Sequence, residues 1–367
     1  MPKKVLFLIL MFLIPVAVLS AFLEFAAPLI IKTPHLVYKE WPGRPVTFHP
    51  GMKHRAVTDY YDNWFTANPL GFNDTEHAPA KPAGVVRILI LGDSFVEALQ
   101  VKPEENAARV MERLAEERGM ALEAVSMGMS GYGQGQQLKT YETIGKTFNP
   151  DMVVIYFCAN DLNDNMERPE YSLSPDGKLM AVEKEIPAES WKTALVRGLL
   201  NRLESYFIVK EVFGRGYRLF FATAEEVRAA RTAQAGVAGG GGIDEGALAH
   251  YAEPEKLKSF ETLVKSLHET VTVRDGKPLV AALVSAGVVS PSLEFEKFLD
   301  EMEKVYHEAG VDTLNLQRLF VERYRREKTP PHFERDVHWN AVGHLWAAGA
   351  ILERVEKQLG AKGVKNG

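Results

Sequence analysis

Short apolar runs alternate with longer amphipathic stretches along most of the chain after residue 84. The short runs have the length of buried strands and are bounded by turn-forming residues, whereas the longer stretches repeat apolar residues at helical spacing. This pattern predicts strands over 85–91, 122–129, 152–158, 278–286 and 311–316. It predicts helices over 104–118, 136–148, 254–271 and 292–309, then one ending at Arg326 and one around 345–352. Such alternation indicates an α/β fold with about five parallel strands.

The N-terminus carries a separate apolar segment. Two lysines, Lys3 and Lys4, precede an uncharged run from Val5 to Leu23. At 1.5 Å per residue its ~19 residues would span about 28 Å, close to a bilayer core of roughly 30 Å. The segment is either an uncleaved signal-anchor or a cleaved signal peptide of a secreted protein. We favour the anchor, because no Ala-x-Ala cleavage site follows and the apolar character resumes through Ile31.

The lysines also predict the orientation of such an anchor. Positive residues on the short N-terminal side favour a cytoplasmic N-terminus. The rest of the chain would then lie outside the cytoplasm, in the periplasm, held by a single-pass helix in the inner (cytoplasmic) membrane.

A long connection interrupts the alternation of strands and helices. Residues 162–253 exceed the usual length of a loop, and they contain an amphipathic stretch from Trp191 to Phe221. The glycine-rich residues 229–242 that follow are typical of a flexible linker. Two interpretations stay open for the amphipathic part: a cap over a functional site, or a peripheral pair of helices.

Composition removes several classes of function. The formal net charge is −5 and no long basic run occurs, which argues against a nucleic-acid partner. The single cysteine, Cys158, lies in an apolar run and is expected to be a buried, inert thiol. No histidines pair on a helix face or with cysteine, so we expect no metal and no other cofactor.

Candidate chemistry begins at Gly92-Asp93-Ser94-Phe95, which ends the first predicted strand of the sheet. Ligands of α/β sheets bind at the carboxyl ends of the strands, so Ser94 is a candidate nucleophile. Its structural alternative is a cap of the next helix.

A serine nucleophile needs a base and an acid that orients the base. Asp336 and His338 stand two residues apart before the last helix and meet this need, on a predicted loop. Glu334 is the alternative acid. The neighbouring His332 and His344 are expected to be structural.

Acyl transfer also requires hydrogen-bond donors for the developing oxyanion. Gly131 follows the second predicted strand and could offer a backbone N–H, while Asn160 follows the third and could offer an uncharged amide donor. Each also has an ordinary interpretation as a turn residue.

The order of Ser94, Gly131, Asn160 and His338 resembles the four sequence blocks of the SGNH hydrolases, also called GDSL esterases and lipases. The resemblance runs from about residue 68 to 359 and includes the lead-in Asn68-Pro69-Leu70-Gly71-Phe72-Asn73-Asp74, which looks typical of bacterial members. It implies a flavodoxin-like three-layer α/β/α sandwich. It also implies Ser94 as nucleophile, His338 as base, and an oxyanion hole made by Ser94, Gly131 and Asn160.

Three positions depart from the family pattern. Phe95 replaces the common leucine of the first block, and Cys158 replaces the usual glycine of the third. Arg335 stands where the family usually has its aspartate, so Asp336 becomes the acid. This Asp-x-His-Trp spacing looks more like that of the alginate O-acetylation enzymes.

The sequence therefore predicts a division into an anchor (1–31), a stalk or strap (32–67), the first part of a hydrolase domain (68–161), a helical insertion with a glycine-rich linker (162–253) and the second part of the hydrolase domain (254–367). The expected function is a serine esterase for carboxylic esters, such as O-acetyl or short acyl esters on carbohydrate. Two alternatives stay open: a cell-envelope polysaccharide O-acetyltransferase, and a non-catalytic anchored binding protein of the same fold.

Overall fold

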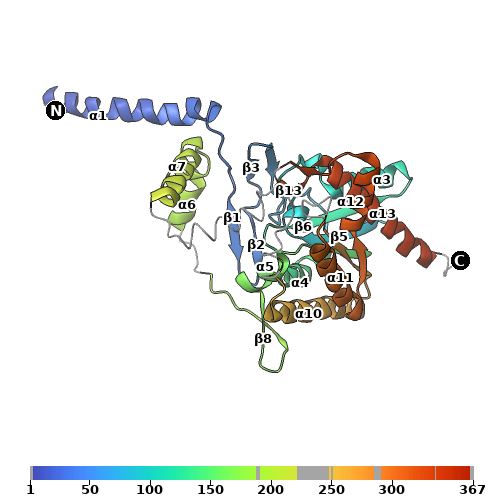
Figure 1. Ribbon diagram of the computed structural model, residues 1–367. Helices are drawn as coiled ribbons and strands as arrows, with labels where there is room; N and C mark the ends of the chain where they lie inside the picture. The colour runs from blue at the N-terminus through green and yellow to red at the C-terminus, as the bar shows by residue number, and fades with distance from the viewer. Residues whose placement is uncertain are drawn as a thin grey trace. The chain divides into compact units, whose positions relative to one another are not determined.

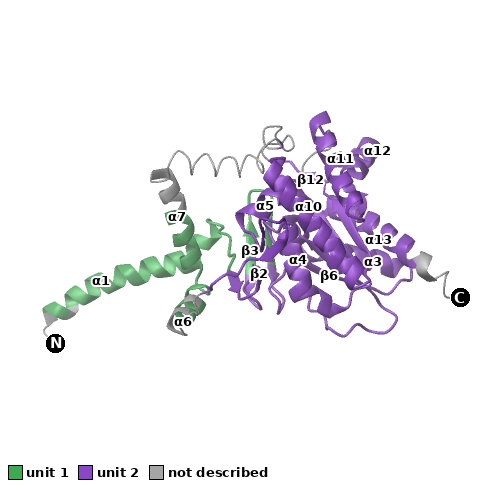
Figure 2. Ribbon diagram, turned by 90° about the horizontal axis from the view of Figure 1, so that it is seen from below, with its two compact units in different colours: residues 1–37, 54–64, 187–232 green, residues 38–53, 65–186, 233–367 purple. Residues whose placement is uncertain are grey.

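The computed structural model describes residues 3–186, 191–220, 248, 251–284, 291–334 and 336–363. The chain divides into two compact units, which are coloured in Figure 2. Unit 1 contains residues 1–37, 54–64 and 187–232. Unit 2 contains residues 38–53, 65–186 and 233–367, and it includes every candidate residue for catalysis.

Unit 2 is built on a parallel five-stranded sheet. Its strands are β5 (Val86–Gly92), β6 (Leu122–Gly128), β7 (Met152–Phe157), β10 (Leu279–Leu283) and β11 (Asp312–Asn315). Their spatial order is β6-β5-β7-β10-β11, and all neighbours run parallel. In chain order this is 2-1-3-4-5, the arrangement of flavodoxin-like folds. The expected α/β fold with five parallel strands is confirmed.

Helices cover both faces of this sheet (Figure 1). One layer holds α3 (Ala107–Glu117), α12 (Leu316–Glu327) and α13 (Ala341–Gly363), which share a buried cluster with Ile88, Val154 and Val280 of the strands. The other layer holds α4 (Gln134–Thr143), α10 (Pro254–His268) and α11 (Leu293–Glu308). There Phe157 of β7 contacts Phe260 of α10. Because strand side chains alternate between faces, both layers have apolar cores.

The helix boundaries differ from the expected ones by a few residues. Residues Pro103–Glu105 form a 3₁₀ turn, and α3 begins only after Asn106, whose side chain accepts the N–H of Ala108 at 2.9 Å. A capping side chain of this kind fixes where a helix starts. After α4, Gly145–Phe148 form another 3₁₀ turn, and after α10, Glu269–Arg274 form a π-helical turn.

Short antiparallel pairs of strands lie outside the five-stranded sheet. They are β1 (Tyr38–Trp41) with β2 (Arg44–Phe48), β3 (Lys53–Val57) with β4 (Asp62–Thr66), β8 (Tyr171–Leu173) with β9 (Leu179–Ala181), and β12 (His332–Phe333) with β13 (Asp336–Trp339). None was expected from the sequence, because so few residues cannot establish an alternating pattern.

Unit 1 begins with the apolar helix α1 (Lys3–Ala21), which continues through a π turn (Phe22–Ala26) and a 3₁₀ turn (Ala27–Leu29). By length and composition, Phe7–Leu29 could cross a membrane; its mean hydropathy is 2.5. Unit 1 also contains α6 (Trp191–Leu200) and α7 (Glu204–Phe220), so the amphipathic stretch forms two helices. The predicted flexible segment 229–242 lies outside the described residues.

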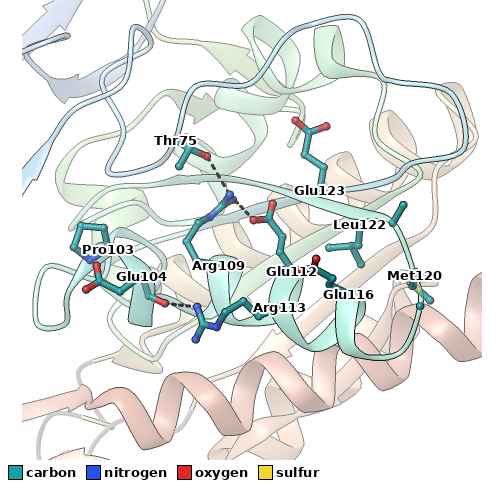
Figure 3. A pocket seen from close by; sticks show the side chains of 12 residues that line it. Thr75, Pro103, Glu104, Arg109, Glu112, Arg113, Glu116, Met120, Leu122 and Glu123 are labelled. Carbon is teal, nitrogen blue, oxygen red and sulfur yellow. Dashed lines mark hydrogen bonds and ion pairs between the residues drawn. The ribbon is translucent and has the colours of Figure 1, made fainter.

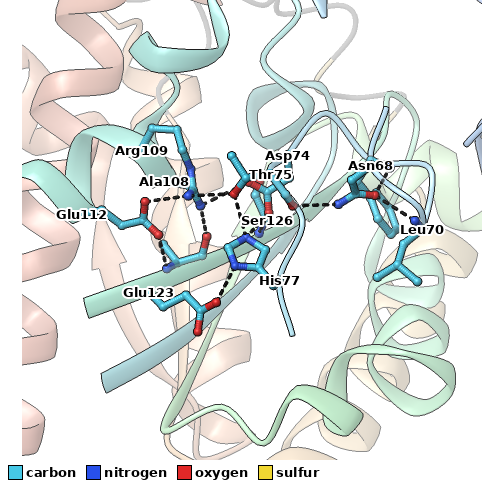
Figure 4. A network of polar contacts seen from close by, with 12 residues as sticks. Asn68, Leu70, Asp74, Thr75, His77, Ala108, Arg109, Glu112, Glu123 and Ser126 are labelled. Atoms are coloured by element: carbon cyan, nitrogen blue, oxygen red, sulfur yellow. Dashed lines mark hydrogen bonds and ion pairs between the residues drawn. The ribbon is translucent and has the colours of Figure 1, made fainter. Parts of the chain in front are cut away.

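Strand β6 is an edge of the sheet, and side chains bind its outer backbone groups (Figure 4). The N–H groups of Ala124 and Ser126 donate to the carboxylates of Glu112 and Asp74, each at 2.8 Å. The guanidinium of Arg109 donates to the carbonyl oxygen of Ala124. The outer N–H groups of both residues and the carbonyl of Ala124 are therefore paired with side chains.

His77 fastens the lead-in segment to the same edge (Figure 4). Its Nε2 lies 3.0 Å from Asp74 and its Nδ1 lies 2.6 Å from Glu123. Burial by itself would lower the pKa of His77, but the two carboxylates outweigh burial and raise it. Since both ring nitrogens face an acceptor, the charged imidazolium fits this position best.

Candidate active site

Ser94 lies directly beyond the carboxyl end of β5, as the first residue of the short helix α2 (Ser94–Glu97). Asp93 caps this helix by accepting the N–H of Phe95 at 3.0 Å, so the cap is not Ser94. A Cβ on Gly92 would lie 2.6 Å from the Val96 side chain. Only glycine lets α2 fold back this tightly against the strand, and the turn leaves Ser94 partly exposed.

The strand order brings the candidate catalytic and oxyanion-binding residues together at the carboxyl edge of the sheet. In a flavodoxin-like sheet the direction in which successive strands are added reverses between the first and third strands, and ligands bind in the crevice outside that point. Here these strands are β5 and β7. Ser94 follows β5, Asn160 follows β7, and Gly131 follows β6 on the other side of β5.

Ser94, His338 and Asp336 form a continuous chain of polar contacts. His338 Nε2 lies 2.8 Å from Ser94 Oγ, and His338 Nδ1 lies 2.5 Å from Asp336 Oδ1. Because a carboxylate oxygen accepts, Nδ1 carries the proton and the Nε2 lone pair faces the serine hydroxyl. This tautomer is the one that a general base needs.

The imidazole of His338 is held by its surroundings. His338 belongs to strand β13, and not to the loop expected from the sequence. The ring of Phe95 packs 5.0 Å from it, and the buried Trp339 follows it in the chain. The backbone N–H of His338 also donates to Asp336 Oδ1 at 3.0 Å. The aspartate therefore fixes both the ring and the strand that carries it.

Asp336 stays ionised in this position. Burial alone would raise its pKa, but the hydrogen bonds and the charge of His338 outweigh burial and lower the pKa below its usual value. The acid that touches His338 is the one two residues before it, so the arrangement does not depend on the alternative acid, Glu334.

Asn160 lies just before helix α5 (Asp161–Glu167), and its amide donates to Asp164 Oδ2 at 2.7 Å. An asparagine amide has two N–H donors, and the hydrogen bond to Asp164 uses one of them to fix the side chain. Burial raises the pKa of Asp164 to about 7, although the hydrogen bond from Asn160 opposes this rise. Asp164 is thus a positioning residue for Asn160.

Gly131 has a positive φ of +79°, a backbone conformation that other residues rarely adopt. A Cβ at this position would lie 3.8 Å from Asp164 Oδ1, which places Gly131 and Asn160 beside the same carboxylate. The hydroxyl of the preceding Ser130 donates to Glu97 Oε2. Glu97 therefore links the glycine loop to the helix that starts at Ser94.

Glu97 is a buried acid beside the candidate catalytic residues. It is 1% exposed, and burial raises its pKa to about 7 despite the hydrogen bonds from Ser130. Sequence analysis missed both Glu97 and Asp164. Their signal was their spacing: an acid three residues after Ser94 and an acid four residues after Asn160 share a helix face with them.

The other histidines near His338 and the single cysteine are buried, as expected for residues with structural roles. His344 is 1% exposed, its Nδ1 accepts the N–H of Ala107 at 3.3 Å, and burial lowers its pKa to about 3. His344 is therefore neutral, and its Nδ1 is already occupied by a structural hydrogen bond. His332 is also buried. Cys158 is buried, and burial raises the pKa of its thiol well above the usual value, which makes it a poor nucleophile.

A cavity of about 900 Å³ lies between α3 and β6, away from these residues (Figure 3). Charged side chains such as Arg109, Arg113 and Glu116 line it beside apolar ones such as Met120 and Leu122, and none of the candidate catalytic residues does. Among the described residues, no group of histidine, cysteine, aspartate or glutamate side chains could hold a metal ion.

No family model matches the chain, and no curated protein matches it. Solved structures similar to it include an acetyl xylan esterase, with 13% identity, a TM-score of 0.43, and coverage of 74% of this chain and 100% of that one. Others are an acetylxylan esterase from Geobacillus stearothermophilus (13%, TM-score 0.39, coverage 73% and 93%) and a lipolytic protein of the G-D-S-L family from Desulfitobacterium hafniense (9%, TM-score 0.41, coverage 73% and 98%). Similarity this distant does not bear on activity.

Proposed function

We propose that unit 2 is a serine esterase in which Ser94, His338 and Asp336 form a catalytic triad. His338 removes the proton of the Ser94 hydroxyl as Oγ attacks the carbonyl carbon of an ester. The bond to the alcohol then breaks, and His338 returns the proton to the leaving alcohol. Water, activated by the same histidine, attacks the acyl-enzyme, releasing the acid and restoring Ser94.

The observation that carries this proposal is the unbroken contact chain from Asp336 through His338 to Ser94 at the open end of the sheet. The N–H groups of Ser94 and Gly131 and the amide of Asn160 are our candidates for stabilising the oxyanion. Each such donor typically contributes about 10²–10³-fold in turnover. The substrates we propose are carboxylic esters with short acyl groups, such as O-acetyl esters on carbohydrate.

The test is hydrolysis of p-nitrophenyl acetate by the full-length protein in detergent, together with labelling by a serine-directed fluorophosphonate. We expect Ser94→Ala to abolish both signals. Ser174→Ala, at a partly exposed serine in the β8–β9 connection, is the matched control and should retain both. Labelling that persists in Ser94→Ala would refute Ser94 as the nucleophile.

Transfer of the acyl group to a sugar hydroxyl is a second candidate activity. The Asp-x-His-Trp spacing of Asp336 and His338 supports it, because this spacing resembles that of the alginate O-acetylation enzymes. Adding an oligosaccharide acceptor to the same assay separates the two. Acetylated sugar formed with Ser94 dependence would identify a transferase, whereas nitrophenol release without acetylated sugar would identify an esterase. If neither signal depends on Ser94, the non-catalytic alternative gains support.

We propose further that α1 is an uncleaved signal-anchor that holds unit 2 outside the cytoplasm. Its apolar side chains support this: none of the most apolar stretch of the span is buried within the protein, and Phe12 is 71% exposed. The basic residues Lys3 and Lys4 lie on the side expected to remain in the cytoplasm. Membrane fractionation with N-terminal sequencing tests this. A soluble product that starts beyond residue 20 would instead show a cleaved signal peptide.

A further inference from the structure

Helices α6 and α7 of unit 1 carry a broad apolar surface that no described residue covers. Seven of their large apolar side chains are exposed: Leu195, Val196, Leu199, Leu200, Val209, Val212 and Phe213. The four on α6 recur at positions i, i+1, i+4 and i+5, and the three on α7 at i, i+3 and i+4, so each set lies on one face of its helix. Contiguous exposed apolar surface of this kind marks an interaction site.

The opposite face of α7 is already used within unit 1. Phe207 and Ile208 are buried, and the ring of Phe207 stacks on His35 at 4.1 Å between centroids. His35 Nε2 also lies 3.1 Å from the carboxylate of Glu204 at the start of the helix. At 100° per residue, Val209 and Phe213 point away from this packed face, and Val212 lies at its edge. Only the outer face of the helix lacks a partner among the described residues.

Glu24 fixes the depth of α7 relative to the candidate membrane span. Its two carboxylate oxygens accept the backbone N–H groups of Glu204 (3.1 Å) and Ser205 (3.0 Å), which are the first residues of α7. An acidic side chain at this position also stabilises the helix N-terminus. Glu24 lies within the span Phe7–Leu29, five residues before its end. At 1.5 Å per residue this is about 8 Å along the helix axis.

Figures 1 and 2 both show α7 beside the C-terminal end of α1. If α1 spans a bilayer, the start of α7 therefore lies at the boundary between the acyl chains and the headgroups. Helices that lie in this boundary bury their apolar face by about 5–10 Å, which matches the position set by Glu24.

The charge of the two helices also suits this boundary. Residues 191–220 contain six basic side chains (Lys192, Arg197, Arg202, Lys210, Arg215 and Arg218) and two acidic ones (Glu204 and Glu211). The whole chain, by contrast, has a formal net charge of −5. A basic, amphipathic helix is typical of a segment that binds the surface of an anionic membrane.

We propose that α6 and α7 form a membrane-interface hairpin whose partner is the anionic lipid surface around the anchor α1. The apolar faces of both helices enter the lipid at headgroup depth, and the positive charge of the segment attracts the anionic phosphate groups. This inference rests on the anchor proposed above, because the depth of α7 is measured from α1.

The test places a fluorophore at single introduced cysteines in the full-length protein, reconstituted in vesicles of phosphatidylcholine and phosphatidylglycerol. Phe213→Cys and Leu199→Cys probe the hairpin, Phe12→Cys probes the anchor, and Lys304→Cys, on α11 of unit 2, is the water-exposed reference. The native Cys158 is buried, so the unmodified protein serves as the labelling control. Nitroxide lipids carry the quencher either near the headgroup or at the end of the acyl chain.

We expect the Phe213 and Leu199 labels to lose most of their fluorescence to the headgroup quencher and little to the chain-end quencher. The Phe12 label should show the opposite preference. If Phe12 is quenched but the hairpin labels behave like Lys304, the anchor stands and the hairpin proposal is wrong. Hairpin labels shielded from both lipid and aqueous iodide would show a protein partner, such as a second copy, and would also overturn it. If Phe12 escapes quenching, the anchor itself fails and the inference fails with it.

Discussion

Phe260 in unit 2 and Phe213 in unit 1 both lie on α-helices, yet Phe260 is fully buried and Phe213 is 73% exposed. Around Phe260, the rings of Phe157 and Tyr306 complete a layer between the sheet and its helices. Around Phe213, the neighbouring large apolar side chains of α7 are exposed as well. Unit 2 supplies its own apolar surroundings, whereas unit 1 presents apolar surface that a bilayer would complete. The same residue types thus form a self-sufficient core in unit 2 and, in unit 1, the surface that we propose contacts the membrane.

The largest expected difference between the units is in catalysis. Asp336→Asn should lower kcat for p-nitrophenyl acetate by about 10⁴-fold, because an amide no longer selects the imidazole tautomer that faces Ser94. Val212→Ser on α7 should leave kcat unchanged, since this residue touches none of the proposed machinery. Steady-state kinetics in detergent measures both. A Val212→Ser protein with kcat lowered as much as that of Asp336→Asn would end the assignment of chemistry to unit 2 alone.

A matched pair of phenylalanine truncations sharpens the contrast in stability. Phe260→Ala should reduce the free energy of unfolding by about 3–5 kcal/mol, because it empties a closed core. In detergent, Phe213→Ala should change it by no more than about 0.5 kcal/mol, as for most exposed positions. Urea unfolding followed by far-UV circular dichroism compares them. Equal losses would mean that α7 is as closely packed as α10.

Within unit 2, the residues that contact the oxyanion should matter more than those that orient them. Asn160→Ala should reduce kcat by about 10²–10³-fold with little change in KM, as expected for a donor that acts in the transition state. Asp164→Asn keeps a hydrogen-bond acceptor for Asn160, so its loss should be smaller. If Asp164→Asn were the more damaging, Asp164 would itself contact the substrate or the reacting atoms.

The smallest expected effect is on the pH dependence of stability. Burial raises the pKa of Glu97 from 4.5 to about 7, so the unfolded chain releases this proton at a lower pH than the folded protein does. The free energy of unfolding should therefore fall as pH rises from 4.5 to about 7, and this group contributes at most about 3 kcal/mol to the fall.

Glu97→Gln removes the titration and keeps an acceptor for Ser130. Urea unfolding at several pH values should show a shallower fall for this variant over the same window. Asp164 titrates in that range too, so some slope should remain. If the free energy of unfolding depended on pH equally in the wild-type protein and in Glu97→Gln, Glu97 would be excluded as the cause of the pH dependence.

The sheet was predictable from the sequence because most of its strands are apolar-rich runs between helical stretches. The order of the strands followed only from the family resemblance, which implies a flavodoxin-like sheet, since apolar patterning does not encode which strands become neighbours. The short strand pairs such as β12–β13 could not be predicted from the sequence either. For this reason His338 was expected on a loop.

In the site, Ser94, His338 and Asp336 could be proposed from residue chemistry and from the family resemblance. For Glu97 and Asp164 the sequence held only their spacing from Ser94 and Asn160, because their contacts depend on proximity after folding. Ser130 lies 33 residues beyond Glu97 in the chain, yet its hydroxyl donates to that carboxylate. Similarly, the packing of His35 on Phe207 joins segments that share no sequence pattern.

The paired edge of β6 has a consequence for how this protein behaves at high concentration. A strand with free backbone groups is a template on which another chain can add a strand, which leads to domain swapping or fibril growth. On β6, Glu112, Asp74 and Arg109 occupy the positions that an incoming strand would need. Two of these side chains are acidic, so an approaching backbone carbonyl meets repulsion as well as steric blockage. The same contacts that fasten the lead-in segment thus protect this edge of the sheet from aggregation.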